Sequence, residues 1–213
     1  AAPEADAGGA AARLADGLDC PNIDHRVREV DFADDASRKV TFDAPIADIE
    51  SMESIVLLGC NIRHDAPILG HRVRKAFLAG AQVFALNPLD WEFHFDLADG
   101  MIAAPQEMVA EFAALAVAVS EATGKALPTE WIKAANGADS ANYRKMAESL
   151  HDSKHAVLLV GQAAMAHPQA SWLRTLSGWI ADACGASLNL LPCGGNTVGA
   201  ATMGALPRTA GLN

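Results

Sequence analysis

The sequence predicts an α/β protein, in which parallel strands alternate with helices around a central sheet. Two apolar runs, at 54–59 and 155–161, each end on a glycine, and a proline and a helical segment follow shortly after. A second apolar run follows each of these helices, at 82–87 and 187–191. A strand, a helix and a second strand in this order form a βαβ unit, whose two strands run parallel.

The helix of the first unit is predicted from its start and stop signals. Asp65 and Pro67 are residues that favour a helix start, and Asp65 is the expected N-cap. The helix is expected over 66–79, with apolar residues at a spacing of four on one face, and it ends at Gly80.

The rest of the chain continues the same alternation. Trp91, Phe93 and Phe95 alternate with polar residues, which predicts a short edge strand within 91–99. Glycines at 124 and 185 are expected to end two helices. The remaining expected elements are helices at 105–122 and 141–150, a strand at 155–161, a helix at 169–183 and a strand at 187–191.

We expect these elements to form two doubly wound, Rossmann-like lobes, one inserted in the other. The inserted lobe spans 51–124, and a crossover spans 125–138. The second lobe spans 139–213, and residues 1–50 form an N-terminal connector and the first part of this lobe. Ligands in such folds bind at the carboxyl ends of the strands, where the loop at 59–64 lies.

The composition excludes several classes of partner. The chain has 213 residues and a formal net charge of −10, so a nucleic acid is not an expected partner. The densest basic group, Arg72, Arg74 and Lys75, is interpreted as a solvated helix face. No apolar stretch reaches the roughly 20 residues that span a bilayer, and no signal peptide is recognised. The four cysteines lack metal or cluster spacing and are expected to be reduced.

No standard catalytic motif is present, so the candidate chemistry rests on short loops. The loop from Gly59 to His64 can receive a phosphate on its backbone N–H groups, or it is simply the tight turn that a βα unit needs. His64 and Asp65 can be read as an acid–base pair, but Asp65 fits better as an N-cap. Cys193 can carry a reactive thiol, although no base can be named for it and a structural role is favoured.

Several segments occur in an order that resembles a known family. They are residues 22–32, the loop 59–67, the basic residues at 72–75 and the closing segment 195–207. Together they resemble the molybdopterin-oxidoreductase-like region of the large iron–sulfur subunit of bacterial NADH:quinone oxidoreductase (respiratory complex I). The resemblance implies two lobes of the formate dehydrogenase/DMSO reductase type.

The resemblance also bears on cofactors. In the molybdenum enzymes of the wider superfamily, the equivalent of residues 22–31 carries a Cys, selenocysteine or Ser that binds molybdenum, with a His often beside it. Alignment by eye places Val30 at the ligand position and Asp31 at the His position, and valine cannot ligate a metal. The complex I branch therefore implies no cofactor, no metal site and no catalytic residue in this segment. The 4Fe-4S and 2Fe-2S clusters are expected in an N-terminal part of the subunit.

The implied function is structural support and assembly within an enzyme that transfers electrons from NADH to quinone. The implied partners are the cluster-bearing N-terminal domain of the same subunit and other peripheral-arm subunits. The implied place is the cytoplasmic side of the bacterial inner membrane, without insertion into it. In this branch, Gly59, Asn61, Gly195 and Asn196 are only vestigial candidates for a nucleotide site.

Two alternatives stay open. In a fragment of a molybdenum-dependent oxidoreductase such as formate dehydrogenase, the same four vestigial candidates would contact a pterin guanine dinucleotide. A free-standing nucleotide-binding module is opposed by the negative charge and by the missing phosphate-binding fingerprints.

Overall fold

One five-stranded sheet forms the centre of the molecule. The computed structural model describes residues 3–34 and 41–207. The strand order is β3-β2-β1-β4-β5, and neighbouring strands pair in parallel. The strands are β1 (Ser54–Leu58), β2 (Gln82–Asn87), β3 (Asp99–Ile102), β4 (Ala156–Val160) and β5 (Ser187–Leu190). The predicted Rossmann-like α/β class is confirmed.

The strands that were expected in two separate lobes lie in the same sheet. β1 and β4 are neighbours, and they pair from Ser54 with Ala156 to Leu58 with Val160. Every residue of β1 and of β4 is buried, which is typical of strands at the centre of a parallel sheet. The two expected lobes are therefore corrected to two halves of one doubly wound sheet, which changes its direction of winding between β1 and β4.

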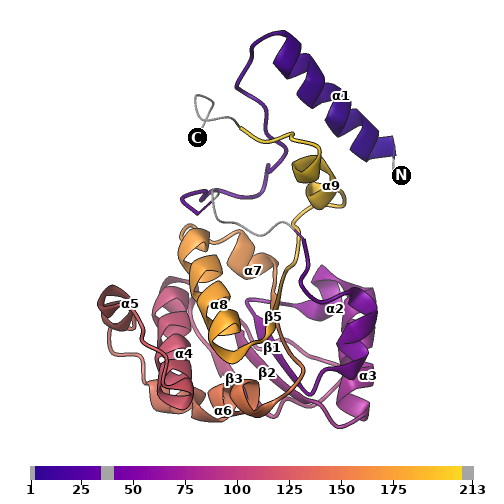
Figure 1. Cartoon of the computed structure of the whole chain (residues 1–213). Helices are drawn as coiled ribbons and strands as arrows, with labels where there is room; N and C mark the ends of the chain where they lie inside the picture. The colour runs from indigo at the N-terminus through magenta and orange to yellow at the C-terminus, as the bar shows by residue number, and fades with distance from the viewer. Residues whose placement is uncertain (1–2, 35–40, 208–213) are drawn as a thin grey trace.

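Helices cover both faces of this sheet (Figure 1). Along β1, Ile55 and Leu57 pack toward one face, and Val56 and Leu58 pack toward the other. The first face carries α3 (Pro67–Leu78) and η1 (Ile46–Ser51), and the second carries α4 (Met108–Thr123), α6 (Arg144–Asp152) and α8 (Ala170–Cys184). Right-handed crossovers that leave the centre in opposite directions place α3 and α8 on opposite faces.

Most helix and strand boundaries agree with the predictions within a few residues. β2 spans the predicted residues, and α4 and α8 end at Gly124 and Gly185, which both have a φ of +70°. The helix expected from residue 105 begins with a short 3-10 turn, η2 (Pro105–Glu107). The crossover at 125–138 contains α5 (Thr129–Ala134), and η3 (Ser140–Tyr143) precedes α6. Within the described residues, no helix is long and apolar enough to span a bilayer.

The edge strand predicted within 91–99 is wrong. Phe93 and Phe95 stack on each other with ring centroids 5.3 Å apart, and Phe95 also contacts Phe77 of α3. Their alternation therefore reflects aromatic packing of a loop against α3 and not a strand. The edge strand is β3, which starts at the end of this loop.

Two helices lie above the carboxyl ends of the strands, α1 (Pro3–Gly17) and α9 (Thr197–Thr202) (Figure 1). They pack closely, since a Cβ on Gly8 would lie 3.5 Å from the Cα of Ala200. In β5, Asn189 Nδ2 donates a hydrogen bond to the carbonyl oxygen of Ala44 at 2.9 Å. Segments far apart in the sequence therefore meet at this end of the sheet.

Candidate functional site

The candidate site lies where β1 and β4 end side by side, at the change in the direction of winding. Open parallel sheets bind their ligands at this switch point, outside the carboxyl ends of the strands. The chain leaves β1 through residues 59–61 into α2 (Ile62–Asp65), and it leaves β4 through residues 161–162, where α7 (Gln162–Met165) begins. We name these stretches the β1 turn and the β4 turn.

The β1 turn and the β4 turn touch each other through glycines. A Cβ on Gly161 would lie 2.3 Å from the Cα of Cys60, and a Cβ on Gly59 would lie 2.7 Å from the backbone nitrogen of Ala164. Gly59 also has a φ of +54°, a backbone angle that residues with a side chain rarely adopt. The backbone N–H of Gly161 donates to the carbonyl oxygen of Leu58 at 2.9 Å. Main-chain atoms therefore fill the crevice between β1 and β4.

The carboxylate of Asp65 links the two turns. Its Oδ2 accepts hydrogen bonds from the backbone N–H groups of Asn61 (3.2 Å) and Gln162 (3.1 Å), one from each turn. The prediction that Asp65 caps α3 is wrong, because Asp65 is the last residue of α2 and the N-cap of α3 is Ala66. Burial raises the pKa of Asp65 above its ordinary value, although the two N–H donors act in the opposite direction.

The position of this carboxylate matters for ligand binding. A phosphate at the start of a helix binds to backbone N–H groups that have no other partner. Here the N–H groups of Asn61 and Gln162 already donate to Asp65. The carboxylate of Asp65 thus occupies the position that a phosphate of a ligand would take.

The four vestigial candidates have different surroundings at this end of the sheet. Gly59 is buried in the contact between the two turns, whereas the buried Oδ1 of Asn61 has no hydrogen-bond partner among the described residues. Gly195 lines two clefts of about 400 and 380 Å³, and the larger one borders the β4 turn. The side chain of Asn196 lies over Gly199, where a Cβ would be 2.2 Å from its Oδ1.

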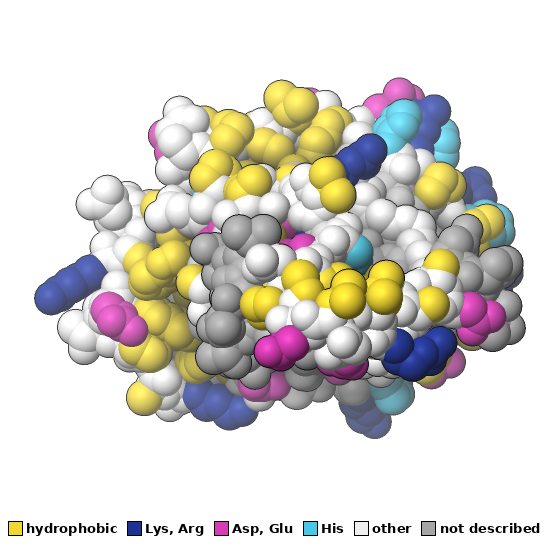
Figure 2. Space-filling view, turned by 90° about the horizontal axis from the view of Figure 1, so that it is seen from above, with side chains coloured by type: hydrophobic (Ala, Val, Ile, Leu, Met, Phe, Trp, Pro, Cys, Tyr) yellow, Lys and Arg dark blue, Asp and Glu magenta, His cyan; other side chains and the backbone are white. Residues whose placement is uncertain are grey.

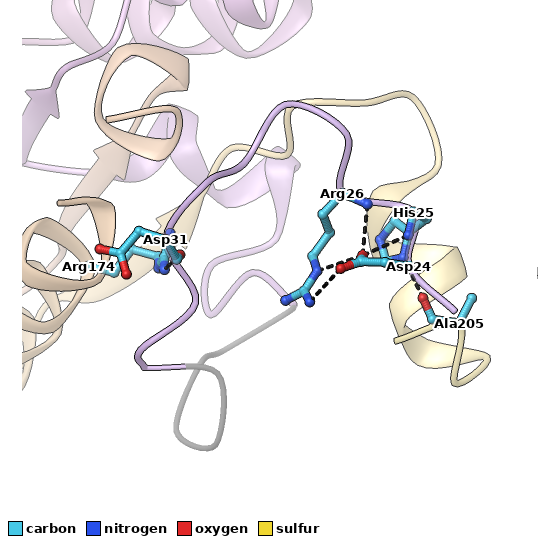
Figure 3. A network of polar contacts seen from close by, with 6 residues as sticks. All are labelled: Asp24, His25, Arg26, Asp31, Arg174 and Ala205. Atoms are coloured by element: carbon cyan, nitrogen blue, oxygen red, sulfur yellow. Dashed lines mark hydrogen bonds and ion pairs between the residues drawn. The ribbon is translucent and has the colours of Figure 1, made fainter. Parts of the chain in front are cut away.

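The segment that contains Val30 is anchored on α8 (Figure 3). Val30 is 64% exposed, and Asp31 accepts hydrogen bonds from the backbone N–H (2.8 Å) and the Oγ (2.6 Å) of Ser171. Arg174 is buried; it donates to the carbonyl oxygen of Asp31 at 2.7 Å and forms an ion pair with Asp34. Burial alone would raise the pKa of Asp31, but the hydrogen bonds from Ser171 and Ala33 and the charge of Arg174 together hold this pKa below its ordinary value.

A second polar group lies nearer to α9 (Figure 3). Arg26 pairs with Asp24 at 2.9 Å, and its guanidinium lies over the ring of Phe32, 4.0 Å from the centroid. The Nδ1 of His25 lies 2.8 Å from the carbonyl oxygen of Ala205. The contact of His25 with Ala205 ties the segment at 24–32 to the segment that follows α9, and the contacts of Arg26 lie within 24–32.

Sequence reasoning missed Arg174 and its partners. Arg174 and Asp34 are 140 residues apart along the chain, so no local sequence pattern indicates their ion pair. No local signal indicated the burial of Arg174 either, because the helical period places it on the side of the predicted helix opposite Leu176, where a solvated cation is expected.

The cysteines and histidines add no metal centre to this region. Burial raises the pKa of Cys60 well above its ordinary value, and it raises the pKa of Cys184 to about 11, although nearby Lys125 acts in the opposite direction. Both thiols are therefore protonated at neutral pH. Cys193 lines both clefts. Among residues 3–34 and 41–207, no group of three His, Cys, Asp or Glu side chains is placed to hold a metal ion.

The sheet, its glycine turns and the clefts beside them define a Rossmann-like domain of the kind that binds cofactors at a switch point. The chain belongs to the molybdopterin oxidoreductase family, whose model matches residues 10–212. No curated protein matches the chain.

A solved structure shares the fold. It is a chain in the X-ray crystal structure of the formyltransferase/hydrolase complex (FhcABCD) from Methylorubrum extorquens in complex with methylofuran, with 13% sequence identity and a TM-score of 0.62. The match covers 94% of this chain and 54% of that one, so this chain spans about half its length. At this identity the likeness shows the fold alone.

Two features act against a molybdopterin cofactor, one in the segment of Val30 and one at the switch point. Val30 has no atom that can bind a metal, and the neighbouring Asp31 is bonded to Ser171. The N–H groups of Asn61 and Gln162 are bonded to a carboxylate, which would repel the phosphates of such a group.

Proposed function

We propose that this chain is a structural segment, without a redox centre of its own, of the large iron–sulfur subunit of a bacterial NADH:quinone oxidoreductase. Membership of the molybdopterin oxidoreductase family supports the superfamily that this proposal assigns to the chain. The ordered segments at 22–32, 59–67 and 195–207 resemble the complex I branch of it. The proposal combines these two lines of support with the geometry of the switch point.

The observation that carries the proposal is the contact between the β1 turn and the β4 turn at the switch point. Gly161 and Cys60 are in main-chain contact, and Asp65 bonds to both turns. A cofactor that carries phosphates needs free N–H donors and a compensating positive charge at this place. The contacts between the two turns instead join the two halves of the sheet, which is a structural role.

In this role the chain braces the cluster-bearing domain of the same subunit and offers surface to other peripheral-arm subunits. The enzyme would sit on the cytoplasmic side of the membrane as a peripheral arm. Electrons from NADH would reach quinone through clusters outside this segment, so no residue of the segment would be catalytic.

Variants in the intact enzyme test this role. Leu158→Asp places a carboxylate in the buried centre of β4 and is expected to abolish both the assembled complex and its NADH:quinone activity. Val30→Ala is expected to leave assembly and rate within about twofold of wild type, because an exposed side chain contributes little. A molybdenum content near one atom per chain, or a rate lost in Val30→Ala with the complex assembled, would overturn the proposal.

One observation favours the alternative function, a molybdenum oxidoreductase fragment that binds a pterin guanine dinucleotide. The unpartnered Oδ1 of Asn61 is a buried acceptor close to where the nucleotide would lie. We nevertheless expect GDP to bind more weakly than about 1 mM, or about 4 kcal/mol, since Asp65 opposes its phosphates. Isothermal titration calorimetry that finds a micromolar site, lost in Asn61→Leu and kept in the control Asn142→Leu, would establish the alternative.

A further inference from the structure

An exposed row of side chains runs along the outer side of α3, and its first residue, Ile68, also lines the cleft that borders the β4 turn. Ile68, His71, Lys75 and Leu78 follow one another at spacings of three and four residues, which places them on one side of the helix. Ile68 is 72% exposed and Leu78 is 65% exposed. We name these four residues the α3 seam.

The opposite side of α3 is buried against the sheet. Its buried residues belong to the core between α3 and the sheet; they are Leu69, Val73 and Ala76. A helix that needs only one covered face normally carries polar residues on the other. The α3 seam instead has a large apolar residue at each end, and the described part of the chain leaves both in solvent.

The surroundings of the α3 seam are basic, although the chain as a whole is acidic. Residues 63–75 hold four of the 16 Lys and Arg residues and one acidic residue, in a chain of net charge −10. Glu50 pairs with both Arg72 and Lys75, and Glu92 pairs with Arg63 at 3.5 Å, so two carboxylates face three of these cations. Arg74 donates to the carbonyl oxygen of His94 at 3.2 Å, and no carboxylate pairs with it among the described residues. Figure 2 shows basic and histidine side chains gathered on the side of the molecule where α2 and α3 lie.

We propose that the α3 seam docks an acidic amphipathic helix of a partner protein. The spacing of its four residues is that of two successive heptads in a helix pair, over the roughly 18 Å length of a 12-residue helix. Ile68 and Leu78 provide the apolar contacts at the two ends. Between and beside them, Arg74 and Lys75 attract Glu or Asp residues that flank the apolar stripe of the partner.

Other negatively charged partners fit this surface less well. A nucleic acid or an anionic membrane presents dense negative charge over a large area, which the net charge of −10 opposes. A single helix engages only the local basic surface. The apolar ends of the α3 seam also add affinity for a helix with an apolar stripe and none for a phosphate backbone. This inference does not depend on the enzyme to which the chain belongs.

Two matched peptides test the docking of an acidic helix on the intact chain. One is a labelled 21-residue helix with Leu at heptad positions a and d and Glu at e and g, and the other has Lys in place of Glu. Fluorescence anisotropy is expected to show at least tenfold tighter binding of the acidic peptide. Ile68→Asp and Leu78→Asp should each weaken that binding at least tenfold, whereas Ile132→Asp on α5, 51% exposed in the wild type, should leave it unchanged.

Several results would overturn the proposal. Equal binding of both peptides, or no effect of Leu78→Asp in a variant that melts like wild type, would exclude a helix at the α3 seam. Tighter binding to duplex DNA or to phosphatidylserine vesicles with the same sensitivity to Leu78→Asp would assign the surface to a polyanion. A dimer in sedimentation that dissociates in Leu78→Asp would assign it to a second copy.

Crosslinking in the host identifies the natural occupant. A photo-crosslinking amino acid at position 78 is expected to capture a segment that is acidic and has apolar residues at spacings of three and four. The same amino acid at position 132 is the control and should not capture that segment. Capture of a basic or non-periodic segment at position 78 would overturn the proposal.

Discussion

Gly161→Ala is the sharpest test of the contact between the β1 turn and the β4 turn. The backbone at Gly161 is extended, with φ −93° and ψ −175°, so alanine adds no strain from this conformation. The whole cost comes from contacts: the new Cβ would lie 2.3 Å from the Cα of Cys60 and 2.7 Å from Oδ2 of Asp65. A backbone atom cannot rotate away, so either the β1 turn or the β4 turn must move.

The magnitude follows from the cost of overpacking. An added methyl group in a tightly packed site costs about 1–3 kcal/mol, and a clash with main chain falls at the upper end or beyond it. We therefore expect a loss of about 3 kcal/mol or more. For a protein of this size, this corresponds to a fall in Tm of about 6–12 °C.

The assay is urea and thermal unfolding followed by circular dichroism. Gly178→Ala in α8 is the matched control, because no atom lies within 4 Å of its added Cβ. This variant should gain about 0.5–1 kcal/mol from the higher helix propensity of alanine. A Tm of Gly161→Ala within about 2 °C of wild type would refute the contact between the turns, and with it the main support for a site without a cofactor.

Further predictions concern the other polar contacts. The raised pKa of Asp65 means that the folded state binds its proton more readily than the unfolded state. Wild type should therefore gain stability relative to Asp65→Asn as the pH falls through the folded-state pKa, and reach the full gain below the unfolded-state pKa of about 3.9, measured by urea unfolding at each pH. Arg174→Met removes the ion pair between buried Arg174 and Asp34 and should cost about 3–5 kcal/mol; a double-mutant cycle with Asp34→Asn should show coupling, and additive losses would contradict the ion pair. Tyr143→Phe removes the 2.7 Å hydrogen bond to Glu111 and should cost about 1–2 kcal/mol in the same urea assay, whereas an unchanged midpoint would show that this bond adds no stability.

The sequence alone determined the order and type of most elements, because their signals are local. β2 lies between Gly80, which follows the end of α3 with a φ of +106°, and Pro88, which cannot donate a strand hydrogen bond, and its bounds match the prediction. Gly185 ends α8 in the left-handed conformation for a reason that depends on the residue itself. The turn at Gly59 was predictable in the same way, and the ordered motifs were sufficient to place the chain in its superfamily.

Local patterns failed where a different contact gives the same pattern. Alternating Phe93 and Phe95 satisfied the rule for a strand, yet they stack on each other in a loop over α3. Asp65 satisfied the rule for an N-cap, yet its carboxylate bonds to Gln162, which lies 97 residues further along the chain. A period or a residue type does not reveal which distant group competes for the same side chain.

Only the tertiary structure decided how the halves of the chain meet. Both apolar runs end on glycine, and this similarity suggested two lobes, but the pairing of β1 with β4 joins them in one sheet. The same pairing brings Gly161 against Cys60 and Asp65 onto both turns at the carboxyl ends of the strands. Such contacts depend on the packing of residues about 100 positions apart, and the free energy that selects them comes from burying both faces of the sheet and not from any property of a single segment.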